Sequence, residues 1–394
     1  MPAAFEAAAA FDGARPAMTF KLGPQGLGYY GEEKGERAAT KRSADGVLVE
    51  VKRQRQEIVL AEDMQPKVKR YSKLDAPTMK LTGHGGAVLS CAFSPDGQTL
   101  LSSSFDKTCF LWSVYGENEH LTTLRGHTNA VLEAHWSSDG ARAYTCSADK
   151  TLACWDAGSG ARIKKLGGQH SHCVNGCSVA KGGGGDDMLA SASDDGWSKV
   201  WDMRAPKRSA QELQHPYPVT AVCWGAGAER LYTGSVDNLI RCYDARKAEA
   251  PLYTLGDHLE IVTGLRLSPD GDFVLSNAMD NTMRIYDVRP FVSGGDAARC
   301  QMLFQGTGCA QQSFDRQLLR GAWSPDGKLI SCGSANRHTT VLERGTGAIR
   351  YRLPGHKGTI TGVSFHPTEP ILASCAGDKT IFLGEVDERW TAEK

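Results

Sequence analysis

The sequence has 394 residues, of which 41% are hydrophobic and 23% are charged, so it can bury the core of one large domain or of two ordinary ones. Its 45 Lys and Arg residues balance its 45 Asp and Glu residues, and this zero net charge excludes a global electrostatic attraction to nucleic acid or to an anionic membrane. The twelve cysteines are scattered, which favours a reducing compartment over a disulfide scaffold, and no apolar run is long enough for a membrane helix.

Residues 1–75 match no repeat, and we expect them to form a disordered tail. The tail carries two basic clusters, Val51-Lys52-Arg53-Gln54-Arg55 and Lys67-Val68-Lys69-Arg70. Residues 41–73 hold nine Lys/Arg against five Asp/Glu, which gives a local net charge of +4. Such clusters suit a nuclear import receptor or RNA phosphates, and an ordinary solvated tail has the same composition. We take Lys52, Arg53 and Arg55 as a candidate import signal.

A repeated pattern governs the rest of the chain. It reads Ser or Thr, three residues, Asp, five residues, then Trp or Tyr. Five copies fit it and two degenerate copies follow in register: Ser102/Asp106/Trp112, Thr145/Asp149/Trp155, Ser191/Asp195/Trp201, Thr233/Asp237/Tyr243, Ser276/Asp280/Tyr286, Cys332/Asn336/Leu342 and Ser374/Asp378/Gly384. Most of the intervals between successive central Asp or Asn residues match the roughly 40 to 45 residues of a four-stranded propeller blade. The sequence therefore predicts an all-β, seven-bladed β-propeller over residues 76–387, followed by a C-terminal tail of residues 388–394.

A histidine precedes most of the central Asp residues by 22 positions, and Phe314 holds this place in the sixth copy. Together these residues resemble the signature of the WD-repeat family. The resemblance implies a buried hydrogen-bonded chain within each blade, made in the first three copies by His84, Ser102, Asp106, Trp112, His127, Thr145, Asp149, Trp155, His170, Ser191, Asp195 and Trp201. Such a network rigidifies a blade when every member is bonded, so we expect copies two and three to be the firmest and copy six the weakest.

The ends of the repeat region predict how the ring closes. The last copy finishes its third strand near Val386, so its outer strand is missing. The segment Thr78-Met79-Lys80-Leu81 stands before the first copy without a blade of its own. We therefore expect this segment to complete blade seven, which would leave the ring with only short strand edges.

Two features indicate recognition. The residue before each central Asp lies at one rim of a propeller, and Phe105 and Met279 are large and apolar there, which fits a partner-facing rim. Large apolar residues at these positions could equally pack against a neighbouring loop. The interval between the central residues Asp280 and Asn336 is the longest, and it adds about a dozen residues near 290–312 to the length of a blade. A loop of this kind either carries recognition or is a plain linker.

Groups that resemble chemical sites are explained by the repeat. His170-Ser171-His172-Cys173 with Cys177 looks like a zinc cluster. However, His170 occupies the blade-histidine position and Cys177 an inward strand position, so we expect buried thiols and no metal. The central Asp residues belong to the network, and the run Gly182–Gly185 lacks the lysine of a phosphate-binding loop. We expect no catalytic residue, no cofactor and no small-molecule substrate.

Further segments resemble the WD-repeat subunits of the U5 small nuclear ribonucleoprotein, a part of the spliceosome. They are Val51–Arg55, Leu111–Gly116, Leu275–Thr282, Asp287–Phe291, Leu318–Arg320, Leu353–His356 and Phe365–Pro367. The resemblance does not extend to residues 1–50. It implies a non-catalytic nuclear scaffold in pre-mRNA splicing that docks on the large U5 spliceosomal scaffold protein and other spliceosome subunits, with indirect contact to RNA and no role at a membrane.

Two other functions remain open. One is a substrate receptor of a cullin-type ubiquitin ligase, because receptors of that family present a Trp-Asp-x-Arg sequence to the ligase adaptor and this chain contains Trp201-Asp202-Met203-Arg204. The other is direct RNA binding by the ring, which is weaker because the repeats lack a basic face with interleaved aromatic residues.

Overall fold

The computed structural model describes residues 70–180, 188–205, 209–247, 250–306 and 317–386, together with the backbone of three strands before residue 32. The chain divides into two compact units, residues 1–67 and 68–394. In the first unit, β1 (Phe5–Ala7), β2 (Met18–Gly23) and β3 (Gly26–Gly31) form an antiparallel sheet in the order β1-β3-β2. We expected a disordered tail in this part of the chain. The other residues of the tail up to residue 69, including the candidate import signal at 51–55, lie outside the described residues.

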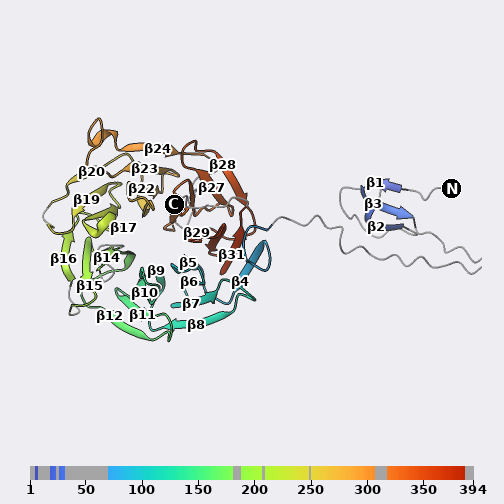
Figure 1. Cartoon of the computed structure of the whole chain (residues 1–394), viewed down its shortest axis with the longest axis horizontal. Coiled ribbons are helices and arrows are strands. Elements are labelled where there is room, and N and C mark those ends of the chain that lie inside the picture. The colour runs from blue at the N-terminus through green and yellow to red at the C-terminus, as the bar shows by residue number, and fades with distance from the viewer. Residues whose placement is uncertain are drawn as a thin grey trace, which may run out of the picture. The chain divides into compact units, whose positions relative to one another are not determined.

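The second unit is a ring of blades. Within its described residues there are seven antiparallel sheets of four strands each, arranged around a common centre (Figure 1). From the inside outward, blade one contains β5 (Val88–Phe93), β6 (Thr99–Ser104), β7 (Thr108–Ser113) and β8 (His120–Arg125), blade two β9 (Val131–Trp136), β10 (Arg142–Ser147), β11 (Leu152–Asp156) and β12 (Arg162–Leu166), and blade three β13 (Val174–Val179), β14 (Met188–Ser193), β15 (Trp197–Asp202) and β16 (Ser209–Gln214).

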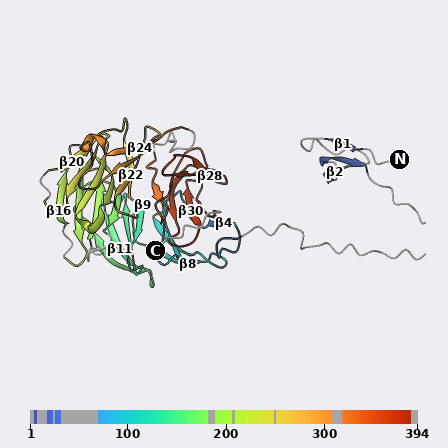
Figure 2. The same cartoon turned by 45° about the horizontal axis from the view of Figure 1, so that its top comes forward.

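The remaining blades follow in chain order. Blade four contains β17 (Val219–Trp224), β18 (Arg230–Ser235), β19 (Ile240–Asp244) and β20 (Tyr253–Leu255), blade five β21 (Val262–Leu267), β22 (Phe273–Ala278), β23 (Met283–Asp287) and β24 (Cys300–Phe304), blade six β25 (Gly321–Trp323), β26 (Leu329–Cys332), β27 (Thr339–Glu343) and β28 (Ile349–Leu353), and blade seven β29 (Ile360–Phe365), β30 (Ile371–Ala376), β31 (Thr380–Glu385) and β4 (Thr78–Thr82). The tilted view in Figure 2 also places the outer strands β16, β20 and β24 on the rim. The predicted all-β, seven-bladed propeller is confirmed.

The predicted turns join the two inner strands of a blade. In the turn after β5, the Ser94 hydroxyl donates to Asp96 Oδ1 at 2.5 Å, and the amide of Gln98 donates to the same oxygen at 3.0 Å. Gly97 has a φ of 75° and lies against His366 of blade seven, whose ring would collide with a side chain at this position. Glycine is therefore required both by the backbone conformation and by the close approach of a neighbouring blade.

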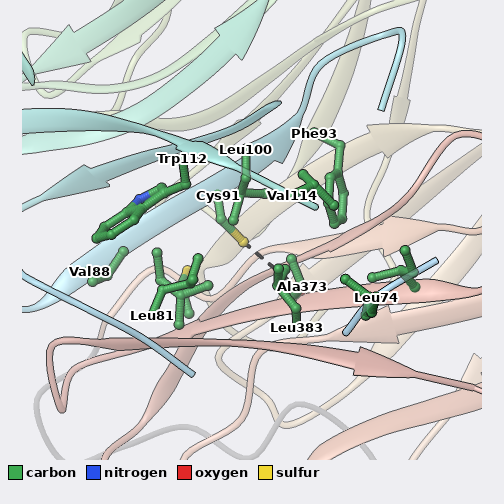
Figure 3. Close-up of a cluster of buried hydrophobic side chains, with 13 residues drawn as sticks. Leu74, Leu81, Val88, Cys91, Phe93, Leu100, Trp112, Val114, Ala373 and Leu383 are labelled. Atoms are coloured by element: carbon green, nitrogen blue, oxygen red, sulfur yellow. Dashed lines mark hydrogen bonds between the residues drawn. The ribbon is translucent and has the colours of Figure 1, made fainter. Parts of the chain in front are cut away.

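Ring closure follows the prediction from the chain ends. The strand β4 pairs antiparallel with β31, with Leu81 opposite Ile381 and Met79 opposite Leu383. The two strands lie side by side in Figure 1 although about 300 residues separate them. Leu81 and Leu383 are both buried in one apolar cluster that joins blade seven to blade one (Figure 3). The N-terminal end of the repeat region thus supplies the outer strand of the last blade.

The core lies between neighbouring blades. In the described part of the ring, seven clusters of buried apolar side chains alternate with the blades, and each cluster combines residues from two adjacent sheets. For example, Tyr144 of blade two and Val179 of blade three belong to the same cluster. Each blade therefore depends on both neighbours for burial, and the ring is stabilised as a whole.

The expected loop at 290–312 contains regular structure. A 3-10 turn, η3 (Asp296–Ala298), is followed by β24, which pairs with β23 and forms the outer strand of blade five. A second 3-10 turn, η2 (Ala226–Ala228), precedes β18. In the described residues, no helix is long and apolar enough to cross a membrane.

Candidate functional site

Blade three shows the hydrogen-bonded network in full. His170 lies in the loop before β13, and its Nδ1 is 2.8 Å from Asp195 Oδ2 in the turn between β14 and β15. Its Nε2 is 2.8 Å from Ser191 Oγ, which also accepts the indole N–H of Trp201 at 2.9 Å. An ionised carboxylate can only accept, so Nδ1 carries the imidazole proton and Nε2 accepts the serine hydroxyl.

The carboxylate of this network is ionised at neutral pH. Burial opposes its ionisation, but hydrogen bonds from His170 and from the amides of Ser171 and Trp197 lower the pKa of Asp195 to about 2. In blade one, burial lowers the pKa of His84, although Asp106 partly opposes that shift. In blade one, a neutral imidazole between the carboxylate and the hydroxyl is therefore the stable state at pH 7.

The structure brings together the same groups in blades one and two. His84 with Asp106, Ser102 and Trp112, and His127 with Asp149, Thr145 and Trp155, form equivalent bonds of 2.8–2.9 Å. Blade one is thus as completely bonded as blades two and three. The order of firmness among the blades stays a prediction.

The network also has the atom order of a Ser-His-Asp catalytic triad. In blade one, however, Ser102 is completely buried, and its hydroxyl oxygen accepts the indole N–H of Trp112 while facing His84. A nucleophile needs an open approach for the reacting atom and nearby donors for the charge that develops. Trp112 occupies the approach, so this arrangement holds strands together.

The other four blades keep less of the network. His258 is bonded to Asp280 and Ser276 at 3.1 and 2.7 Å in blade five, and His356 is bonded to Asp378 and Ser374 at 3.3 and 3.0 Å in blade seven. In blade seven the aromatic partner of His356 is Phe382, at a ring distance of 4.7 Å, rather than a residue at the Gly384 position. Phe110 stacks on His84 in the same way in blade one. Phe110 and Phe382 are each the fourth residue after the central Asp of their blade, and an aromatic residue at that position was the sequence signal for this contact.

Blade four departs from its sequence pattern. Asp237 pairs with Arg241, with Nη2 2.5 Å from Oδ2, instead of with His215. A carboxylate forms stronger charge-assisted bonds with a guanidinium than with a neutral imidazole. Among the described residues, His215 Nε2 and Thr233 Oγ1 are left buried without a partner. Burial and the charge of Arg241 lower the pKa of His215 to about 4.

Blade six has replaced the network by local bonds. Its central residue, Asn336, accepts the amide of His338 at 3.0 Å, and the innermost strand β25 has three residues where most others have six. Phe314, predicted at the histidine position, lies outside the described residues.

One face of the ring carries the turns between second and third strands and the loops that enter the innermost strands; we call it the turn face. The amide of Phe105 donates to Ala87 O and that of Met279 to Ile261 O, both at 2.8 Å, which joins each turn to the adjacent loop. The side chain of Phe105 is 63% exposed, whereas Met279 is partly buried. Phe105 thus presents an apolar ring to solvent.

Two further apolar side chains lie on the turn face. Leu259 is 79% exposed, and its carbonyl accepts the Asn238 side chain from the turn of blade four. Tyr217, in the loop before β17, is 54% exposed. Leu259 follows the blade histidine His258 by one residue, and Tyr217 follows His215 by two. Their position after the histidine was the sequence signal that could have placed them on the turn face. Phe105, Tyr217 and Leu259 are thus exposed large apolar side chains on the turn face, in blades one, four and five.

Charged side chains from three blades meet at their innermost strands. Glu133, 3% exposed on β9, lies within 2.6 Å of Arg266 Nη2 and 3.1 Å of Arg320 Nε, and His135 Nε2 lies 3.1 Å from the same oxygen. Burial alone would raise the pKa of Glu133, but Arg320, Arg266 and His135 lower it well below its usual range. This ion cluster unites blades two, five and six.

The suspected zinc ligands are separated in the structure. His170 belongs to the network of blade three, while Cys177 is fully buried and lies with Glu133 and His135, all three within 4.8 Å. These atoms are close enough for a metal, yet the carboxylate is already neutralised by two arginines. Such a donor set does not suit a cation, which needs an unpaired negative ligand.

The candidate ligase motif ends on an exposed side chain. Arg204 is 64% exposed, and its Nε lies 3.2 Å from Asp202 Oδ1 within the same motif. Arg289 makes the equivalent pair with Asp287 in blade five. The motif is thus a local ion pair at the end of a third strand, repeated in two blades.

A closed ring of four-stranded blades with His-Asp-Ser/Thr-Trp networks defines a WD-repeat propeller. The family model described as WD domain, G-beta repeat, matches residues 75–113, 118–156, 207–244, 249–287 and 347–383. The chain is 43% identical over 317 residues to the U5 small nuclear ribonucleoprotein 40 kDa protein of Dictyostelium discoideum, covering 80% of this chain and 86% of that protein. It is 42% identical over 354 residues to the protein of that name from Homo sapiens, covering 86% and 96%.

A fission-yeast relative carries a second name. The pre-mRNA-splicing factor cwf17 of Schizosaccharomyces pombe is 36% identical over 320 residues, covering 81% of this chain and 91% of the relative. The chain belongs to the WD-repeat family and, within it, to the group of the U5 small nuclear ribonucleoprotein 40 kDa proteins.

Proposed function

We propose that the chain is a non-catalytic, protein-binding scaffold subunit of the U5 small nuclear ribonucleoprotein and acts in pre-mRNA splicing in the nucleus. The observation that carries this proposal is the identity of 42% over 354 residues, which cover 86% of this chain and 96% of a U5 40 kDa protein. The relative named as a splicing factor supports the same role. The triad-like groups of the blades are buried inside the sheets, which supports a scaffold rather than an enzyme.

The proposed partner is the large U5 scaffold protein, and the proposed docking surface is the turn face. Phe105 and Leu259 are exposed apolar side chains on that face, and central apolar anchors contribute most of the binding energy in protein interfaces. Met279, which was predicted to face a partner, is partly buried and adds a smaller apolar contact to the proposed docking surface. The chain as a whole has no net charge, which supports an indirect contact with RNA.

Affinity capture tests the proposal. The tagged full-length chain is purified from nuclear extract, and an unrelated WD-repeat propeller with the same tag serves as the control. We expect the large U5 protein and other U5 proteins to be enriched at least tenfold over the control, as mass spectrometry measures it. Recovery of a cullin and its adaptor without U5 proteins would contradict the proposal and would favour the role suggested by the Trp201–Arg204 motif.

A further inference from the structure

The segment before the ring-closing strand is held by an acidic side chain of blade seven. We call residues 70–75 the clasp. Arg70 Nε lies 2.8 Å from Glu385 Oε2, and the amides of Tyr71 and Ser72 both donate to Glu385 Oε1, the latter at 2.8 Å. The carboxylate of Glu385 therefore receives a guanidinium and two backbone N–H groups of the clasp.

A second carboxylate and a buried leucine complete the clasp. The amide of Lys73 donates to Glu369 Oε2 at 2.9 Å. Leu74 is 3% exposed and belongs to the apolar cluster of Leu81 and Leu383 (Figure 3). Because the clasp continues directly into β4, any event that loosens it acts on the strand that closes the ring.

Ser72 lies in the middle of the clasp behind a run of basic residues. It is half-buried, and its hydroxyl accepts the Leu74 amide at a long 3.4 Å. Lys67, Lys69 and Arg70 precede it by five, three and two positions. Kinases choose substrates partly by charge patterns, and basophilic kinases use acidic pockets that hold such residues before the acceptor serine.

We propose that Ser72 is a phosphorylation site for a basophilic protein kinase and that the phosphate releases the clasp from blade seven. In the reaction, Ser72 Oγ bonds to the γ-phosphorus of ATP as the bond to the bridging oxygen of ADP breaks. The hydroxyl proton passes to a base of the kinase, and ADP leaves. No other co-reactant is needed.

The release follows from the charges around the site. A phosphoserine carries a charge of about −1.5 to −2 at pH 7. Ser72 donates its amide to Glu385, and the next residue donates to Glu369, so the phosphate is placed beside two carboxylates. Hydrogen bonds to the clasp, though opposed by burial, lower the pKa of Glu385, which is therefore ionised. Repulsion and competition for Arg70 both weaken the clasp.

The clasp must open before a kinase can bind Ser72. A kinase binds its substrate serine in an extended segment, so the clasp must open transiently. Its bonds lie at a partly exposed surface and involve side chains rather than a strand ladder, and such segments open more easily than the sheets they cover. Phosphorylation then traps the open form, because reclosure brings the phosphate back to Glu385.

The experiment uses the full-length chain with ATP and the catalytic subunit of cyclic-AMP-dependent protein kinase as the probe. Mass spectrometry locates the phosphate, and Ser72→Ala is the matched control. Hydrogen exchange then compares the phosphorylated and unmodified chains. We expect one phosphate on Ser72 and exchange at least tenfold faster in residues 71–75, with unchanged exchange in β13 of blade three.

Ser72→Glu gives a second, kinase-independent measurement. It should exchange faster than Ser72→Ala in residues 71–75, and Glu385→Gln should reduce the difference between the two variants because one source of repulsion is removed. Failure of the kinase to modify Ser72 would overturn the proposed site. Slower or equal exchange in the phosphorylated chain, with the phosphate held by Arg70, would overturn the proposed release.

Discussion

Arg320 enters the centre of the ring from blade six and places its Nε 3.1 Å from Oε1 of Glu133, on the innermost strand of blade two. Its Nη1 and Nη2 donate to the carbonyl oxygens of Leu132 and Asn175 at 2.8 and 2.6 Å. Blade six, whose described residues show none of the His-Asp-Ser/Thr bonds of blade three, is therefore tied across the ring to blades two and three.

Removal of the Glu133 charge should destabilise the whole propeller. In Glu133→Gln the guanidinium groups of Arg320 and Arg266 lose their shared carboxylate, and the side chain of Arg320 is only 7% exposed. Breaking a buried ion pair costs about 3–5 kcal/mol. Urea unfolding should show this loss. The control is Glu229→Gln, whose pair with Arg246 is 65% and 77% exposed and should contribute less than about 1 kcal/mol. Equal stability of the two variants would contradict a structural role for the cluster.

Stability should fall as the pH is lowered from 7 to 5, because a buried histidine must stay neutral in the folded ring. The folded pKa of His215 is about 4, below the value of about 6.5 in an unfolded chain. Between these values the unfolded state binds the extra proton, so this contribution is complete above pH 6.5 and is lost as the pH falls towards 4. The linkage corresponds to about 2 kcal/mol between pH 7 and 5 for this residue.

The measurement is urea unfolding at both pH values for the wild type and for His215→Gln. The variant should lose less stability on acidification than the wild type. A pH dependence that is identical in the two proteins would show that His215 titrates normally in the folded ring.

Ring closure by β4 should be visible in the thermal unfolding. Leu81 is 3% exposed and pairs with Ile381, so Leu81→Ala leaves a cavity at the seam and should cost about 2–5 kcal/mol. Deletion of residues 76–82 should cost more, because blade seven then exposes the edge of β31. The exposed neighbour Thr82 provides the control, and Thr82→Ala should change stability by less than about 0.5 kcal/mol. An unchanged melting temperature after the deletion would refute closure by this strand.

The repeat was sufficient to predict the architecture. Each network residue is local to one blade, and the contact between His170 and Asp195 survives an insertion that lengthens their spacing, because both residues lie in turns that the strands hold in register. Ring closure was also predictable. The last copy of the repeat lacks an outer strand and a spare strand precedes the first copy, so pairing the two completes blade seven.

The contacts that cross the ring could not be read from the repeat. Glu133 and Arg320 are 187 residues apart in unrelated blades, and the pairing depends on the radius of the ring. One sign was present: Glu133 is the third residue of its strand, where five of the other innermost strands have Ser90, Gly176, Ala221, Gly264 and Gly362. The clasp escaped prediction because it follows no repeat, and Arg241 displaced His215 because a stronger partner for Asp237 lay four residues away.

The candidate import signal makes a prediction about localisation. Replacing Lys52, Arg53 and Arg55 by alanine in a fluorescent fusion should leave part of the protein in the cytoplasm, because import receptors bind clustered positive charge. Replacing Lys34, Arg37 and Lys41 removes the same charge from elsewhere in the tail and should have no effect. Complete nuclear accumulation of the first variant would assign import to another segment or to a partner.

The most direct measurement of the central claim is the amount of U5 RNA that copurifies with the tagged chain from nuclear extract. The wild type and Ile163→Asp, which alters an exposed apolar residue on the outer strand β12, should enrich U5 RNA equally over U1 RNA. The double variant Phe105→Asp with Leu259→Asp should recover at least tenfold less, because charges replace the apolar residues of the turn face. Equal recovery of U5 RNA with this double variant would contradict docking through the turn face, and no enrichment with the wild type would contradict membership of the U5 particle.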